Sequence, residues 1–187
     1  QVYNFNELDA NGTPVFDPEG AFEYEVPMNG STAKNYGVEL IARQRFGFLP
    51  GALRGLSAGI SATFTDSEAT YPNRDDDRDL PLPGFSKFIF TGSVEWAWRG
   101  FNIRGDYRYR DAYVEGLGDS IESDEFYDAE QRVDLEASYT FATGLRTFAT
   151  VTNLTDEAQV SYSGYSQFVE DASLAGRKFT IGLGYKF

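Results

Sequence analysis

The carboxy-terminal stretch Phe179-Thr-Ile-Gly-Leu-Gly-Tyr-Lys-Phe187 decides the fold. Every second position carries a large apolar side chain: Phe179, Ile181, Leu183, Tyr185 and Phe187. The positions between them are small or polar, namely Thr180, Gly182, Gly184 and Lys186. This alternation predicts a β-strand whose two faces meet different surroundings. A strand of a soluble β-sandwich fits the pattern, and so does a strand of a transmembrane β-barrel, with one face in lipid and the other in a wet lumen.

The same alternation recurs along the chain and predicts a series of strands. They are expected at residues 36–46, 56–65, 87–98, 101–110, 132–141, 144–154 and 177–187. In segment 144–154 the phase stays open, because Phe148 and Val151 fall on opposite faces. No stretch predicts an amphipathic helix, and none approaches the ~18 consecutive apolar residues of a membrane-spanning helix. We therefore expect an all-β protein.

The predicted strands are joined by connections of alternating length. Short links lie at 46–53, 98–101 and 141–145, and long polar ones at about 6–35, 66–84, 111–130 and 156–176. The long connections hold 24 of the 29 acidic residues and three of the 16 basic ones. On the strands, arginines lie opposite the aromatic side chains, whereas an arginine facing lipid costs ~2–4 kcal/mol at the midplane. Short turns at one end, long loops at the other and charge on one face favour an antiparallel transmembrane β-barrel.

Composition excludes several classes of function. The chain has no cysteine and no histidine, so it forms no disulfide or thiolate metal site and lacks the commonest general base. A net charge of -13 argues against nucleic acid as a partner. We expect neither an enzyme nor a cofactor.

Several segments taken together resemble the carboxy-terminal part of a TonB-dependent outer-membrane receptor barrel. They are PMNGSTAKNYGVEL at 27–40, FLPGALRGL at 48–56, TDS at 65–67, LPLPGFS at 80–86, VDLEASY at 133–139, VTNLTDE at 151–157 and GRKFTIGLGYKF at 176–187. The resemblance implies the last seven or eight strands of a barrel of about 22 strands whose lumen is plugged. It also implies a location in the bacterial outer membrane and the import of a scarce nutrient with TonB energy.

The resemblance further implies partners for the chain. They are the remainder of the receptor with its plug and amino-terminal strands, the TonB complex through the plug, outer-membrane lipid and lipopolysaccharide, and a small extracellular ligand such as a carbohydrate or a ferric siderophore. The plug and the TonB box lie elsewhere in the protein. Because the chain opens QVYNFNELDA, without the signal of an exported protein, we expect residues 1–187 to be a segment of a longer polypeptide.

Three groups of residues are candidates for function. A charged lumen patch comprises Arg104, Asp106, Arg108, Arg110, Arg132, Asp134 and Glu136, and it forms either a cross-strand ion-pair ladder or a contact with plug or substrate. Six loop aromatics either stack on a ligand or pack on one another: Tyr113, Phe126, Tyr127, Tyr162, Tyr165 and Phe168. A solvated acidic loop or a weak calcium site is expected at Asp75, Asp77 and Asp79.

Two other functions stay open at this point. A small self-contained outer-membrane barrel or adhesin would need strands that close on themselves. A soluble β-sandwich that binds carbohydrate would need a second sheet to cover the apolar face.

Overall fold

A computed structural model describes residues 3–8, 14–16, 32–71, 80–118 and 120–185. The chain divides into two units, Gln1–Gly30 and Ser31–Phe187. In the first unit, β1 (Tyr3–Leu8) pairs antiparallel with β2 (Pro14–Phe16). In the second unit, the predicted all-β fold is confirmed.

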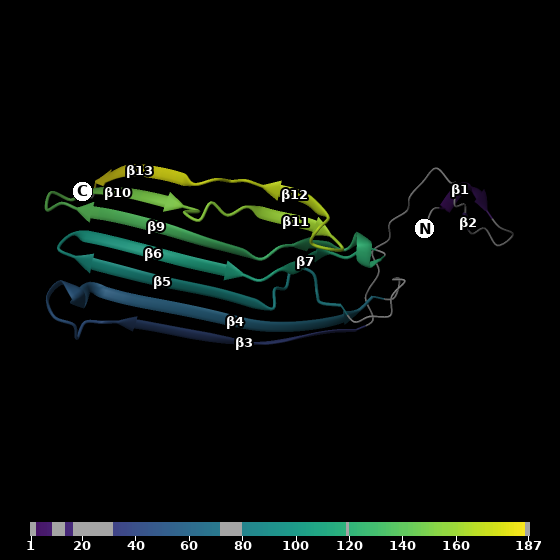
Figure 1. Ribbon diagram of the computed structural model, residues 1–187, viewed down its shortest axis with the longest axis horizontal. Coiled ribbons are helices and arrows are strands. Elements are labelled where there is room, and N and C mark those ends of the chain that lie inside the picture. The colour runs from purple at the N-terminus through teal and green to yellow at the C-terminus, as the bar shows by residue number, and fades with distance from the viewer. Residues whose placement is uncertain (1–2, 9–13, 17–31, 72–79, 119, 186–187) are drawn as a thin grey trace. The chain divides into compact units, whose positions relative to one another are not determined.

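The second unit contains a seven-stranded antiparallel sheet (Figure 1). Its strands are β3 (Thr32–Arg45), β4 (Leu56–Thr70), β5 (Phe88–Trp98), β6 (Phe101–Arg110), β9 (Glu130–Thr140), β10 (Leu145–Thr152) and β13 (Lys178–Tyr185). Their order in the sheet is β13-β10-β9-β6-β5-β4-β3, so each strand pairs with the neighbour that follows it in the series. These seven strands correspond to the seven segments that the alternation predicted.

The register sorts the side chains onto two faces, because directly paired residues of an antiparallel sheet lie on the same side. One row across the sheet reads Trp96, Ile103, Ala137, Ala149 and Ile181. The next row, on the opposite face, reads Glu95, Arg104, Glu136, Thr150 and Thr180. The first face is apolar over its middle rows and carries Asp66 and Glu68 near the end of β4. It is called here the apolar face, and the second is called the polar face.

The apolar face is not covered by any other part of the described chain. Ile181 has 85% of its surface exposed and Leu183 has 72%. Among the described residues, the only buried hydrophobic side chains are those of Ala69, Leu80 and Val114. A sheet without a core of its own must bury its apolar face against something else.

The structure settles the phase of β10, which the sequence left open. Thr147, Ala149 and Val151 pair with Leu183, Ile181 and Phe179 and thus lie on the apolar face. The aromatic ring of Phe148 lies on the polar face, directly over Gly182. Gly182 leaves the space that this ring needs, because a Cβ atom there would lie 2.2 Å from the Cζ atom of Phe148.

The two ends of the sheet differ as the connection lengths predicted. The β3–β4, β5–β6 and β9–β10 turns meet at one end, together with the end of β13, and the long connections extend from the other (Figure 1). The end with the turns is called here the turn end. The β3–β4 turn contains the 3₁₀ helix η1 (Gly51–Gly55). No helix in the described residues is long and apolar enough to span a membrane.

Two long connections, expected to be loops, instead contribute strands to a second sheet. They hold β7 (Tyr113–Gly116), η2 (Ile121–Ser123), β8 (Glu125–Tyr127), β11 (Gln159–Ser163) and β12 (Val169–Ser173). The four strands pair antiparallel in the order β12-β11-β8-β7. We call this the loop sheet. Its strands are only three to five residues long, too short for a period of two to stand out in the sequence.

The packing of Phe148 on Gly182 yields a first prediction. In the full-length receptor, Gly182→Ala should lower the free energy of unfolding by about 1–3 kcal/mol, because the added methyl group overlaps the ring. Gly184→Ala is the matched control on the same face of β13, where an added Cβ atom meets nothing within 4 Å. Urea unfolding in detergent measures both. Equal stabilities of the two variants would show that Phe148 does not pack there.

Candidate functional site

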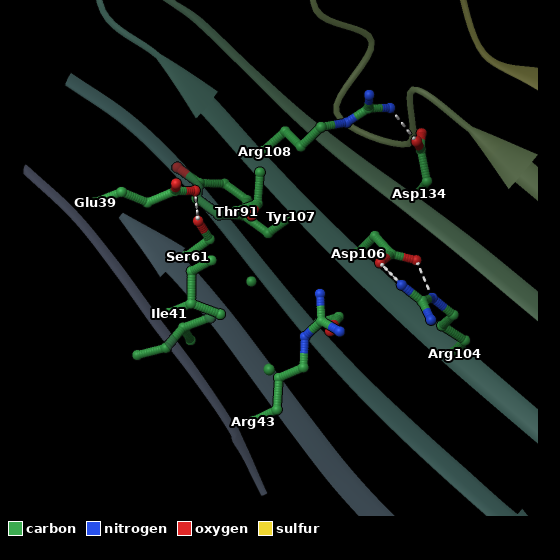
Figure 2. A pocket seen from close by; sticks show the side chains of 14 residues that line it. Glu39, Ile41, Arg43, Ser61, Thr91, Arg104, Asp106, Tyr107, Arg108 and Asp134 are labelled. Carbon is green, nitrogen blue, oxygen red and sulfur yellow. Dashed lines mark hydrogen bonds and ion pairs between the residues drawn. The ribbon is translucent and has the colours of Figure 1, made fainter. Parts of the chain in front are cut away.

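A concavity of ≈ 530 Å³ lies on the polar face and is lined by side chains from five adjacent strands, β3 to β6 and β9 (Figure 2). Its charged groups are three arginines and three carboxylates: Arg43, Arg104, Arg108, Glu39, Asp106 and Asp134. The period-two alternation places all of them on one side of the sheet. Four members of the predicted lumen patch therefore line a common hollow.

The ion pairs of this hollow do not run straight across the strands. Arg108 faces Arg132 directly in the register, and Asp106 faces Asp134, so the direct neighbours carry like charges. Arg108 instead leans to Asp134, with 2.9 Å between Nη2 and Oδ2. Arg104 binds Asp106 on its own strand through two bonds of 2.7 Å. The expected cross-strand ladder is thus replaced in part by a pair within one strand.

Glu136 and Arg132, two further members of the patch, form ion pairs next to the hollow. Arg146 of β10 donates to Glu136 at 2.8 Å and to the buried hydroxyl of Ser138 at 3.2 Å. Arg132 lies 4.0 Å from Glu130. Because the side chains of these pairs remain partly exposed, each pair contributes no more than about 1 kcal/mol of stability. The network therefore fixes the positions of these side chains on the polar face and adds little stability.

Arg43 differs from the other arginines of the hollow. Its guanidinium group points into the concavity (Figure 2). Within the described residues no carboxylate lies within ion-pair distance of Arg43. Glu39, on the same strand, accepts a hydrogen bond from Ser61 at 3.3 Å. As far as the described residues show, the hollow therefore offers Arg43 as an unpaired cation, together with several fixed hydrogen-bonding groups, to whatever fills it.

Arg110 also lies on the polar face but does not line this hollow. Its Nε atom donates to Ser86 Oγ and its Nη2 atom to the carbonyl of Gly84, each at 2.7 Å. Its guanidinium carbon lies 3.6 Å from the centre of the Tyr113 ring. Arg110 thus ties the end of β6 to a long connection and to the loop sheet, a role that its alternation did not reveal.

Asn153 is a residue that sequence reasoning missed as a site residue. It is buried, and its backbone N–H donates to Asp134 Oδ1 at 2.9 Å. Its side chain donates to the carbonyls of Glu157 and Gly176 and accepts from Glu157 and Thr155. Asp134 therefore connects the hollow to the base of the last long connection. The left-handed backbone of Asn153, with φ 55°, suits asparagine better than most residues.

The six loop aromatics divide into two groups. Four pack within the loop sheet as the pairs Tyr113–Tyr127 and Phe126–Tyr162, with ring centres 5.5 and 5.2 Å apart. Tyr165 and Phe168 pair with each other at 6.3 Å and remain about half exposed. Burial raises the pKa of Tyr162, and Asp128 adds to this rise, so its hydroxyl stays protonated at neutral pH. Of the six, only the second pair presents open ring surface.

The remaining candidates are placed only in part. Phe179, Ile181, Leu183 and Tyr185 share the apolar face of β13, whereas Phe187 lies outside the described residues. Asp75, Asp77 and Asp79 also lie outside them. Within the described ranges no group of three or more acidic side chains is arranged to hold a metal ion.

The Asn153 network yields a second prediction. Asn153→Ala removes four side-chain hydrogen bonds and should increase the proteolysis and hydrogen exchange of residues 154–177 at least tenfold, since each buried bond contributes about 1 kcal/mol. Thr155→Val removes one of these bonds and should change both rates much less. Unchanged rates in Asn153→Ala would contradict the role assigned to this side chain.

Comparison with known proteins agrees with this geometry. The family model described as TonB dependent receptor-like, beta-barrel, matches residues 2–154. No curated protein and no solved structure gave a match. The matched region covers β3 to β10, and thus most of the sheet and every charged residue of the hollow. The chain belongs to the TonB-dependent receptor β-barrel family, whose members are transporters, not enzymes, and typically lie in the outer membrane.

Proposed function

We propose that this chain forms the carboxy-terminal part of the barrel wall of an active transporter in the bacterial outer membrane. The observation that carries the proposal is the two-sided sheet. From the row of Val38 on β3 to Tyr185 on β13 no charged side chain lies on the apolar face, and the arginines and carboxylates gather on the other face. Lipid on one side and a hydrated lumen on the other suit these two faces.

The edges of the sheet support the view that the barrel continues in other parts of the receptor. In the described residues, β3 and β13 each pair on one side only. Unpaired backbone groups in lipid cost several kcal/mol each, so strands in a bilayer must close into a barrel. Receptors of this kind have about 22 strands around a plug. We infer that about fifteen further strands and the plug come from the rest of the polypeptide.

The loop sheet supports a role in capturing the ligand. It rises from the end of the barrel wall opposite the short turns, where the long connections gather (Figure 1). The stacked pairs inside it give a firm support, and Tyr165 and Phe168 present exposed rings above it. Aromatic rings bind the apolar faces of sugars and of siderophore rings. A carbohydrate or a ferric siderophore is therefore the proposed cargo, and import draws on the TonB complex through the plug.

The structure weighs against the other two functions. A self-contained barrel would join β3 to β13, yet these strands stand at opposite edges of the described sheet. A soluble sandwich would cover the apolar face with a second sheet, and this face is exposed. The loop sheet continues from the end of the wall without covering it (Figure 1).

Uptake by cells that express the full-length receptor tests the proposal. Labelled oligosaccharides and ferric siderophores are screened, and uptake of the cargo should stop when a protonophore collapses the proton gradient, while surface binding persists.

The double variant Tyr165→Ala/Phe168→Ala should weaken binding about tenfold or more, since each exposed ring contributes about 1 kcal/mol. Phe48→Ala, which removes an exposed ring at the opposite end, is the control. Uptake that continues unchanged after the proton gradient has collapsed would refute active transport.

A further inference from the structure

Three arginines surround a second concavity, of ≈ 580 Å³, at the turn end of the sheet. Arg45 is the last residue of β3 and lies on the polar face, in the row of Ser57 and Glu95. Arg54 lies in η1, and Arg99 lies in the turn between β5 and β6. All three are exposed. The concavity shares no lining residue with the hollow of the polar face.

No acidic group of the described chain neutralises these arginines. None of the three lies within ion-pair distance of a carboxylate among the described residues. The three short connections, 46–55, 99–100 and 141–144, contain no aspartate or glutamate, whereas the long connections are strongly acidic. The turn end thus presents positive charge that only an external anion can balance.

The fold holds the three cations in place. Trp96, on the apolar face, donates from Nε1 to the carbonyl of Ala52 at 3.0 Å and so fixes η1 against β5. Gly55 allows this close approach, because a Cβ atom there would lie 1.9 Å from the carbonyl oxygen of Ala97. The turn at Arg99 and Gly100 has two positive φ angles, 47° and 89°, as in the tightest hairpins. The arginines are therefore supported by rigid turns.

An apolar groove begins where the cationic concavity ends. Phe101 lines the concavity and also a groove of ≈ 400 Å³ that reaches Ile103, Ala149 and Ile181 on the apolar face. Beside the concavity, the β3–β4 turn exposes the ring of Phe48. A ligand that fits both surfaces needs an anionic head and an apolar tail.

We propose that this composite site binds an anionic phospholipid, with its phosphate between Arg54 and Arg99 and an acyl chain in the groove that starts at Phe101. Guanidinium groups bind phosphate oxygens through paired hydrogen bonds. A free phosphate ion would leave the groove empty, so the groove favours a lipid as the source of the phosphate. The proposal rests on the proposed function in one respect: the apolar face must lie in a bilayer.

The test uses the purified full-length receptor and native mass spectrometry with palmitoyl-oleoyl phosphatidylglycerol. Arg54→Gln should weaken binding of this lipid about fivefold, and Arg54→Gln/Arg99→Gln about twenty-five-fold. Arg43→Gln is the matched control, because it removes an equally unpaired charge from the polar face of β3. Ala149→Phe fills the groove without changing any charge and should also weaken binding. Phosphatidylcholine and inorganic phosphate serve as the comparison ligands.

The outcomes separate this proposal from the proposed function. Equal binding of phosphatidylglycerol by wild type and the Arg54→Gln/Arg99→Gln variant would overturn the lipid site. Full displacement of the lipid by inorganic phosphate, together with an unaffected Ala149→Phe variant, would show a simple anion site and also overturn the proposal. A heat-modifiable band on gels confirms that each variant is folded. Cargo uptake by the double variant should equal that of wild type, so a failure of the transport proposal appears in the uptake assay alone.

Discussion

The separation of charge between the two faces of the sheet is the constraint on which the rest of the structure depends. The rows of the apolar face from Val38 on β3 to Tyr185 on β13 are free of charged residues, and charges on that side begin only beyond them, at Asp66 and Glu68 of β4. A single arginine within these rows would cost ~2–4 kcal/mol in lipid. The arginines and carboxylates of the hollow are restricted to the lumen side. There Arg108 faces Arg132 and Asp106 faces Asp134 in the register, and the ion pairs run diagonally or within one strand.

The described sheet also has almost no interior of its own, because few of its side chains are buried within it. Its stability comes from backbone pairing, from lipid against the apolar face and from whatever fills the polar hollow. Two local contacts add to the stability of the sheet. The ring of Phe148 packs over Gly182, and the side chain of Asn153 holds the base of the last long connection by hydrogen bonds. Away from the spanning rows, exposed aromatic side chains lie in the connection between β11 and β12, and unpaired arginines lie on the turns of the described chain.

Sequence alone predicted the parts that follow from simple periodicity. The seven wall strands, the alternation of turns and long connections, and the apolar face of β13 needed only the period of two. The sequence could not assign the phase of β10, because the large apolar side chain of Phe148 lies on the polar face. Its ring fits there only because Gly182, 34 residues later in the chain, has no side chain. The loop sheet was missed because its strands are short and polar. Arg110 lies on the face that its alternation predicted, but its bonds to Ser86 and Gly84 are tertiary contacts, which a face assignment does not contain.

The accessibility of spin labels at Ile181 and Gly184 tests the central claim most directly. The two sites lie on one strand, on opposite faces, and neither substitution meets a packed neighbour. In the full-length receptor reconstituted in a bilayer, a label at Ile181 should collide with dissolved oxygen and be shielded from a water-soluble nickel reagent. A label at Gly184 should show the reverse. Equal exposure of both labels to the nickel reagent would contradict a lipid-facing wall.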